Sequence, residues 1–203
     1  MKMLDKYREK ADKVLTPFAE KMNIKANLLS YLSLISAFFA GLFAYFSYEN
    51  NLLLIPTSFL ILMNGFFDAL DGKIARMKRE ANERGDFIDH VIDRFSDVFI
   101  IGGFIISPWV EKSIGIFAIS SVLLVSYLGT QAQAVGYKRI YSGILGRADR
   151  IAILFISPLI QFFIKEKIFS FYFMTWVMIY FSLAGIFTII ERYYRVMKWF
   201  EEK

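Results

Sequence analysis

Residues 68–97 read DALDGKIARMKREANERGDFIDHVIDRFSD and lie between two strongly apolar stretches of the chain. This segment carries eight of the 19 acidic residues. Carboxylates beside hydrocarbon are costly to desolvate, so they must be paired, bound to a metal or open to a watery cavity. The segment therefore predicts a functional site where apolar helices reach water.

The flanking sequence consists largely of uncharged stretches, in a chain of 203 residues that is 56% hydrophobic. About 20 apolar residues cross a bilayer as a helix. Three stretches reach that length, and three shorter ones do so if neighbouring polar residues extend the helices. The long stretches are 26–48, 113–137 and 168–190, and the shorter ones are 50–67, 98–110 and 151–164. We predict an all-α integral membrane protein with six transmembrane helices.

Basic residues predict the orientation of these helices. All but three of the 24 lysines and arginines lie in the N-terminal segment, between Lys73 and Arg94, in residues 138–150 or in the C-terminal tail. With six spans, these four segments share one side, which the positive-inside rule makes cytoplasmic, and the acidic segment lies there too. The net charge of +5 then reflects topology and attraction to anionic lipids, and no nucleic-acid partner is expected.

The first 25 residues have a pattern of their own. Apolar side chains recur there at helical spacing between charged ones, which is typical of an amphipathic helix in the membrane interface; a surface helix with a packed apolar stripe is the alternative. We therefore predict one membrane domain over residues 1–203, with an interfacial segment at 1–25 and a six-helix bundle at 26–200. The absence of cysteine excludes disulfides and thiol chemistry.

The aspartates of the opening segment are spaced for convergence. Asp68 and Asp71 share a face at the end of the second predicted span, and Asp89 and Asp93 share a face at the start of the third. The basic loop between them predicts antiparallel neighbouring helices. Four carboxylates in one place repel unless cations intervene, and oxygen clusters suit Mg²⁺ or Mn²⁺. Two such ions would clamp an in-line displacement at phosphorus; ordinary ion pairs at helix ends are the alternative.

Nearby residues are suited to a nucleotide. Gly72 and Gly85 lack side chains and let a helix backbone approach a bulky ligand closely. Arg76 lies five residues after Asp71 and can bind a diphosphate by charge-assisted hydrogen bonds. His90, the only histidine, is expected to have a structural or headgroup-contacting role.

These residues together have the spacing Asp68-x2-Asp71-Gly72-x2-Ala75-Arg76-x8-Gly85-x3-Asp89-x3-Asp93. The spacing resembles, position for position, the signature of the CDP-alcohol phosphotransferase family. The resemblance covers almost the whole chain and implies a six-helix membrane enzyme that forms a homodimer.

The resemblance also implies roles for individual residues. Asp68, Asp71, Asp89 and Asp93 are expected to bind two Mg²⁺ or Mn²⁺ ions, and Asp93 to act as general base. Asp68, Gly72, Ala75, Arg76 and Gly85 are expected to bind the CDP part of a CDP-lipid, with Arg76 on the diphosphate. The implied reaction belongs to phospholipid biosynthesis: a hydroxyl deprotonated by Asp93 attacks the lipid-linked phosphorus of CDP-diacylglycerol or CDP-archaeol, and CMP leaves.

The acceptor alcohol is indicated by residues 126–150, SYLGTQAQAVGYKRIYSGILGRADR. They are similar to the acceptor region of archaeal members that make archaetidylglycerol phosphate or archaetidylinositol phosphate. Clustered arginine favours a phosphate-bearing acceptor, and we expect a polyol phosphate, either glycerol phosphate or inositol phosphate. Gln131 and Gln133 stand where makers of inositol phosphate lipids often have basic residues, which argues against inositol phosphate. The candidate acceptor residues are Gln131, Gln133, Lys138, Arg147, Arg150 and Arg192.

Three other functions are compatible with parts of this pattern. A family member with an unphosphorylated acceptor (serine, glycerol or inositol) would not need the arginines. A cation transporter also has intramembrane carboxylates, but these usually lie at mid-bilayer depth on broken helices. A scaffold with a metal-binding acidic cluster would release no CMP from a CDP-lipid.

Overall fold

A computed structural model of the chain describes residues 15–21, 26–78, 82–138, 140 and 142–203, and these are almost entirely helical. No strand forms in the described ranges, where Ile168 and Phe171 make a single isolated bridge. The prediction of an all-α protein is thus confirmed. The long helices are α2 (Ala26–Phe46), α3 (Leu54–Met77), α4 (Glu83–Ile106), α5 (Lys112–Ala134), α6 (Arg147–Phe163) and α7 (Phe173–Glu201); the short 3-10 helix η1 is Asn51–Leu53.

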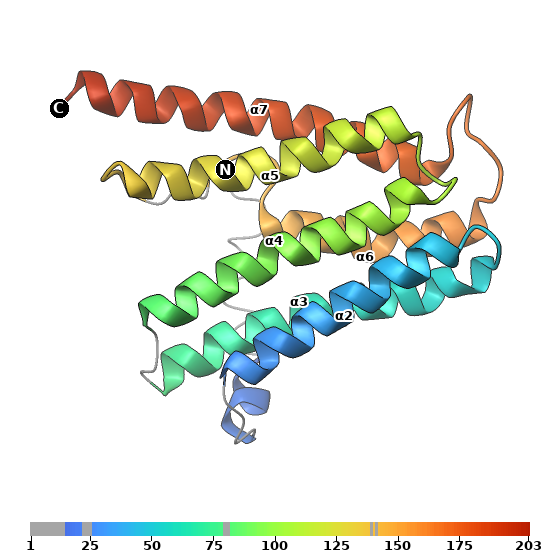
Figure 1. Cartoon of the computed structure of the whole chain (residues 1–203), viewed down its shortest axis with the longest axis horizontal. Coiled ribbons are helices and arrows are strands. Elements are labelled where there is room, and N and C mark those ends of the chain that lie inside the picture. Colours follow the sequence, from blue (N-terminus) through green and yellow to red (C-terminus); the bar gives the residue numbers. More distant parts are fainter. Residues whose placement is uncertain (1–14, 22–25, 79–81, 139, 141) are drawn as a thin grey trace.

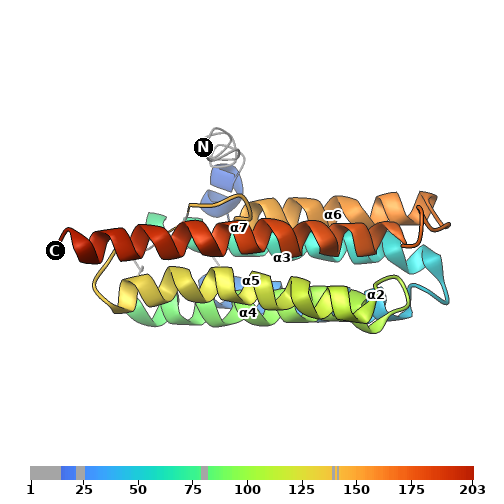
Figure 2. The same cartoon turned by 90° about the horizontal axis from the view of Figure 1, so that it is seen from above.

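The long helices run side by side in two layers, α3, α6 and α7 in one and α2, α4 and α5 in the other (Figure 2). Neighbours in contact follow the order α2, α3, α6, α7, α5, α4 and back to α2, so the bundle closes on itself. Successive helices alternate in direction, and the α3–α4 and α5–α6 connections lie at the same end as the C-terminus (Figure 1). The predicted adjacency of α3 and α4 needs one refinement, because α2 packs along both and they have little direct contact.

Four helical segments are long and apolar enough to cross a membrane: Ala26–Phe46, Asn51–Met77, Lys112–Ala134 and Phe173–Glu201. α4 and α6 do not reach that level, because each begins with a charged segment that takes up part of its length. The last predicted stretch, 168–190, is displaced in the structure. Residues 168–171 form a turn, and α7 begins at Phe173 and continues through the charged tail to Glu201.

The short helix at residues 15–21 packs against the bundle. Ala19 is buried with Leu29 of α2 and with Leu70 and Ile74 of α3, and the ring of Phe18 meets that of Phe66 edge-on at 5.5 Å. The rest of the predicted interfacial segment, residues 1–14 and 22–25, lies outside the described residues. The described part therefore covers the same end of α3 that carries Asp68 and Asp71.

Side-chain caps fix where the site-bearing helices begin. The Asn82 side chain accepts a hydrogen bond from the Gly85 amide at 2.9 Å, so α4 begins at Glu83. Asp149 accepts one from the Gly146 amide at 3.2 Å, so α6 begins at Arg147. Such caps satisfy amide groups that the helix itself leaves free. They fix the start of α4 six residues before Asp89 and the start of α6 at Arg147.

α2 and α4 cross at a pair of glycines, Gly41 and Gly103. A Cβ at Gly103 would overlap the carbonyl of Gly41, and a Cβ at Gly41 would overlap the carbonyl of Phe99. We expect Gly103→Ala to destabilise the bundle by about 1–3 kcal/mol, because backbone cannot move aside as a side chain can. Gly102→Ala is the matched control, since a Cβ there would meet no atom within 4 Å beyond the backbone of its own helix and its chain neighbours. Equal thermal unfolding midpoints for the two variants in detergent would contradict this account of the crossing.

Candidate active site

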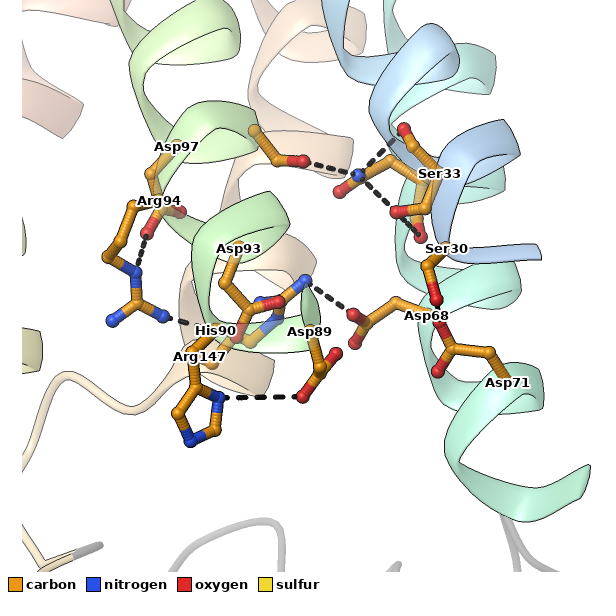
Figure 3. Close-up of polar contacts among 12 residues, drawn as sticks. Ser30, Ser33, Asp68, Asp71, Asp89, His90, Asp93, Arg94, Asp97 and Arg147 are labelled. Atoms are coloured by element: carbon orange, nitrogen blue, oxygen red, sulfur yellow. Dashed lines mark hydrogen bonds and ion pairs between the residues drawn. The ribbon is translucent and has the colours of Figure 1, made fainter. Parts of the chain in front are cut away.

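Carboxylates from α3 and α4 meet at one end of the bundle (Figure 3). Asp68, Asp71 and Asp89 each place an oxygen within 4.8 Å of the other two. Asp89 forms a second such group with His90 and Asp93. Asp71 and Asp93 are each only 5% exposed. The structure therefore brings together the four aspartates whose convergence the sequence predicts.

Polar side chains of α2 support this cluster. Ser30 donates a hydrogen bond to Asp71 Oδ2 at 2.6 Å. One turn deeper, the Asn64 side-chain amide of α3 donates to Ser33 Oγ at 2.7 Å and to Ser96 Oγ of α4 at 3.1 Å. These buried bonds tie α2, α3 and α4 together beneath the carboxylates (Figure 3). Buried polar groups satisfied in this way favour one arrangement of the helices.

Arg147, the first residue of α6, bridges the two acidic helices. Its Nη2 lies 2.8 Å from Asp68 Oδ1, and its Nη1 contacts Asp93 Oδ1. Arg94 Nη2 lies 3.1 Å from the other oxygen of Asp93. Two guanidinium groups thus offset part of the negative charge of the cluster.

A buried ion pair holds α6 against α4 about one helical turn after Arg147 and Asp93. Arg150 Nη2 donates to Asp97 Oδ2 at 2.8 Å, and the two side chains are 2% and 5% exposed. Removal of one member of such a pair leaves an uncompensated buried charge, which is strongly destabilising. The pair therefore fixes the start of α6, where Arg147 lies.

Two cavities open beside the carboxylates. The first has a volume of about 500 Å³ and lies between α2, α3 and the start of α4. The second has a volume of about 270 Å³ and lies between α4, α5, α6 and α7. Asp89 lines both, so both cavities border the acidic cluster. The arginines that line the second cavity are Arg94, Arg147, Arg150 and Arg192.

The sequence profile of CDP-alcohol phosphatidyltransferases matches residues 23–190, most of the chain. This chain belongs to the CDP-alcohol phosphatidyltransferase family. It is accordingly a transferase of substituted phosphate groups that acts in phospholipid biosynthesis, and an integral membrane protein. The expectations of an enzyme and of this family are confirmed.

Named relatives and solved structures of this family cover nearly all of the chain. Archaetidylinositol phosphate synthase of Methanothermobacter thermautotrophicus is 29% identical over 94% of this chain and 92% of its own length. The synthase of the same name from Pyrococcus horikoshii is 27% identical over 97% of each chain. Phosphatidylinositol phosphate synthase of Mycobacterium tuberculosis with CDP-DAG bound superposes with a TM-score of 0.73 at 18% identity, covering 91% of this chain and 94% of that one. The same enzyme in complex with manganese and citrate gives a TM-score of 0.72.

Six of the eight signature positions of the CDP-alcohol phosphatidyltransferase line the first cavity, and Asp68 and Asp93 line the second. Gly72, Ala75, Arg76 and Gly85 line the first cavity together with Asp71 and Asp89, and Asn27 and Ser30 of α2 face it as well. Asp68, predicted to contact both metal and nucleotide, lines the second cavity instead.

The predicted acceptor residues separate into two groups. Arg147, Arg150 and Arg192 line the second cavity. Gln131, Gln133 and Lys138 are exposed and line neither cavity. The glutamines lie in the last turn of α5 and are exposed. Ser126 and Gly129, earlier on the same helix, line the second cavity with the arginines.

Arg192 of α7 holds the connection between α5 and α6. Its Nε donates to the Ser142 carbonyl at 3.0 Å, and its Nη1 donates to the Val125 carbonyl. One turn earlier, Thr188 Oγ1 accepts from the amides of Ile144 and Leu145 at 3.1 and 3.3 Å. These bonds position the loop that leads directly into Arg147.

The donor set of the family's acidic cluster suits a hard divalent cation. Three of its groups are carboxylates on two helices, and oxygen ligands are those that Mg²⁺ and Mn²⁺ prefer. His90 Nδ1 lies 3.6 Å from Asp89 Oδ2, and its Nε2 lies 3.4 Å from Asp86 Oδ1. The histidine thus contacts two acidic side chains. The residues present therefore fit a cation site.

Proposed function

We propose that this chain transfers a lipid phosphate group from a CDP-lipid to a hydroxyl of a polyol phosphate and releases CMP. The observation that carries the proposal is that the acidic cluster borders both cavities. One cavity has the family's nucleotide residues, the other has four arginines, and Asp89 belongs to both. A diphosphate in the first and a phosphate-bearing alcohol in the second would meet at the carboxylates.

Asp68, Asp71, Asp89 and Asp93 are the residues proposed to hold two Mg²⁺ or Mn²⁺ ions. When bound, such ions neutralise the diphosphate and stabilise charge on the leaving CMP. On the protein side, Ser30 holds Asp71 in place, and Arg76 faces the same cavity as a partner for the diphosphate.

Asp93 is proposed to act as general base in this transfer. Its buried carboxylate lines the second cavity, where the acceptor hydroxyl would lie. The proton passes from that hydroxyl to Asp93 while the hydroxyl oxygen forms a bond to the lipid-side phosphorus. The bond from this phosphorus to the bridging oxygen of the diphosphate breaks, and CMP takes the bridging oxygen with it.

Inositol phosphate is the acceptor that the relatives favour over glycerol phosphate. Relatives at 29% and 27% identity over nearly the whole chain are named archaetidylinositol phosphate synthases. The uncharged Gln131 and Gln133 argued against inositol phosphate, but they are exposed and line neither cavity. A cavity with four arginines suits a phosphate ester.

We propose that all six long helices span the membrane. The charged first turns of α4 and α6 would then lie at the level of the lipid headgroups. Residues 1–25 would lie in the interface, and the chain would form one domain. Basic residues near the α3–α4 and α5–α6 connections and in the C-terminal part of α7 lie at the site-bearing end, which supports a cytoplasmic active site. The homodimer expected from the family resemblance stays a prediction.

Release of CMP from a CDP-lipid tests the acceptor directly. The purified protein would be given CDP-archaeol or CDP-diacylglycerol with inositol phosphate, glycerol phosphate, inositol, glycerol or serine in turn. We expect a polyol phosphate to react about 100-fold faster or more than the unphosphorylated alcohols, because only a phosphate makes charge-assisted hydrogen bonds with the arginines of the second cavity. Faster release with serine or glycerol than with both polyol phosphates would contradict the proposal.

A further inference from the structure

Arg147 contacts the carboxylates that a divalent cation would need, and it also lines the cavity proposed for the acceptor. We infer that Arg147 exchanges between two sets of partners, Asp68 and Asp93 in one state and the acceptor's phosphate in the other. Acceptor binding and cation binding are thereby coupled. The second half of this inference rests on the proposed polyol phosphate acceptor.

The first set of partners overlaps the cation site. Asp68, 2.8 Å from Arg147 Nη2, belongs to the group with Asp71 and Asp89 whose oxygens lie within 4.8 Å of one another. Asp93, which Nη1 contacts, belongs to the group with Asp89 and His90. The Arg147 guanidinium therefore reaches one carboxylate of each group (Figure 3).

A guanidinium and a divalent cation compete for these oxygens. Both bind through carboxylate lone pairs, and the guanidinium has donors only, so it cannot serve as a ligand itself. The two positive charges also repel at such short separation. Complete coordination by Asp68 and Asp93 thus requires Arg147 to leave them.

The second cavity provides a place for Arg147 to go. Two of its neighbours there are already held, Arg150 by Asp97 and Arg192 by the carbonyls of Ser142 and Val125; the third, Arg94, shares Asp93 with Arg147. Both partners that the structure gives Arg147 are, in contrast, carboxylates of the cation groups. A phosphate accepts two parallel hydrogen bonds from one guanidinium and is a suitable alternative partner.

Thermodynamic linkage sets the sign of the effect. A phosphate that draws Arg147 away removes a competitor from Asp68 and Asp93, so it raises the affinity for the cation, and the cation raises the affinity for the phosphate equally. The same exchange frees an Asp93 oxygen to accept the proton of the acceptor hydroxyl. Arg147 would then make the cation site complete only when the acceptor is present.

Binding of Mn²⁺ to the full-length protein in detergent, followed by the electron paramagnetic resonance of free Mn²⁺, tests this exchange without turnover. With no nucleotide or phosphate present, we expect Arg147→Gln to bind Mn²⁺ at least about fivefold more tightly than wild type. Arg76→Gln is the matched control, because it removes one positive charge from the first cavity, where Arg76 has no described contact with a carboxylate. Arg147→Lys keeps the charge but cannot bridge two carboxylates in the same way, and we expect an intermediate affinity.

The second arm repeats the titration with inositol phosphate present. A titration without protein measures how much Mn²⁺ the inositol phosphate itself binds, and this amount is subtracted. We expect inositol phosphate to raise the Mn²⁺ affinity of wild type by about 5- to 150-fold and that of Arg147→Gln by less than about twofold. Equal anion-free affinities for Arg147→Gln and Arg76→Gln would overturn the inference, as would an undiminished rise in Arg147→Gln. The anion-free arm contains no acceptor, so it tests competition by Arg147 even if CMP release rejects polyol phosphates.

Discussion

Replacement of Asp93 by Asn is expected to lower the rate of CMP release by about 10²–10⁴-fold, the usual contribution of a general base. The Asp93 side chain is 7% exposed and lies between Arg147 and Arg94 at the edge of the second cavity. Asparagine has the same shape, and Arg147 and Arg94 keep Asp68 and Asp97 nearby, so we expect the helices to pack as before. Its amide, however, cannot take a proton from the acceptor hydroxyl, and it loses a carboxylate oxygen from the proposed cation site.

The control for this variant is Glu83→Gln, which removes one exposed carboxylate from the first turn of the same helix. Its rate should stay close to that of wild type. Thermal unfolding of both variants would show whether the fold is retained. Turnover of Asp93→Asn within about twofold of the control would remove the general-base assignment.

Removal of divalent cations is the second change with a large expected effect. We expect excess chelator to lower CMP release by at least about 100-fold and added Mg²⁺ or Mn²⁺ to restore it. Without cations, the aspartates of α3 and α4 repel a diphosphate, and charge on the leaving CMP is not neutralised.

Asp71→Asn provides a matched test within the chain, because Asp71 is buried in the group with Asp68 and Asp89. We expect this variant to need more cation for half-maximal rate. Ser30→Ala, which removes only the 2.6 Å hydrogen bond to Asp71, should have a smaller effect in the same direction. An undiminished rate of wild type in excess chelator would refute the cation requirement.

Local periodicity explains how much of the site could be predicted. Asp68 and Asp71, like Asp89 and Asp93, are spaced by about one helical turn, so their shared faces follow from the sequence alone. Gly72 and Arg76 follow Asp68 at intervals of four residues, and Gly85 precedes Asp89 by four; the two glycines and Arg76 line one cavity in the structure. Uncharged length likewise predicted where most helices lie, although α7 extends past its apolar stretch because charged residues continue a helix readily at a membrane surface.

Contacts between distant segments could not be predicted in this way. The bridge from Arg147 to Asp68 and Asp93, and the bond from Ser30 to Asp71, depend on how α6 and α2 pack against the acidic helices. Whether Gln131 faces the second cavity depends on how α5 is rotated about its own axis. Spacing within one helix contains no information about the rotation of another helix against it.

Anomalous diffraction from crystals grown with Mn²⁺ tests most directly whether the carboxylates of α3 and α4 form a cation site between two cavities. We predict manganese peaks at about 2.1 Å from oxygens of Asp68, Asp71 and Asp89, the ligand distance of a small divalent cation. Peaks confined to other parts of the molecule, with Asp68, Asp71 and Asp89 bound to no ion at saturating Mn²⁺, would contradict it.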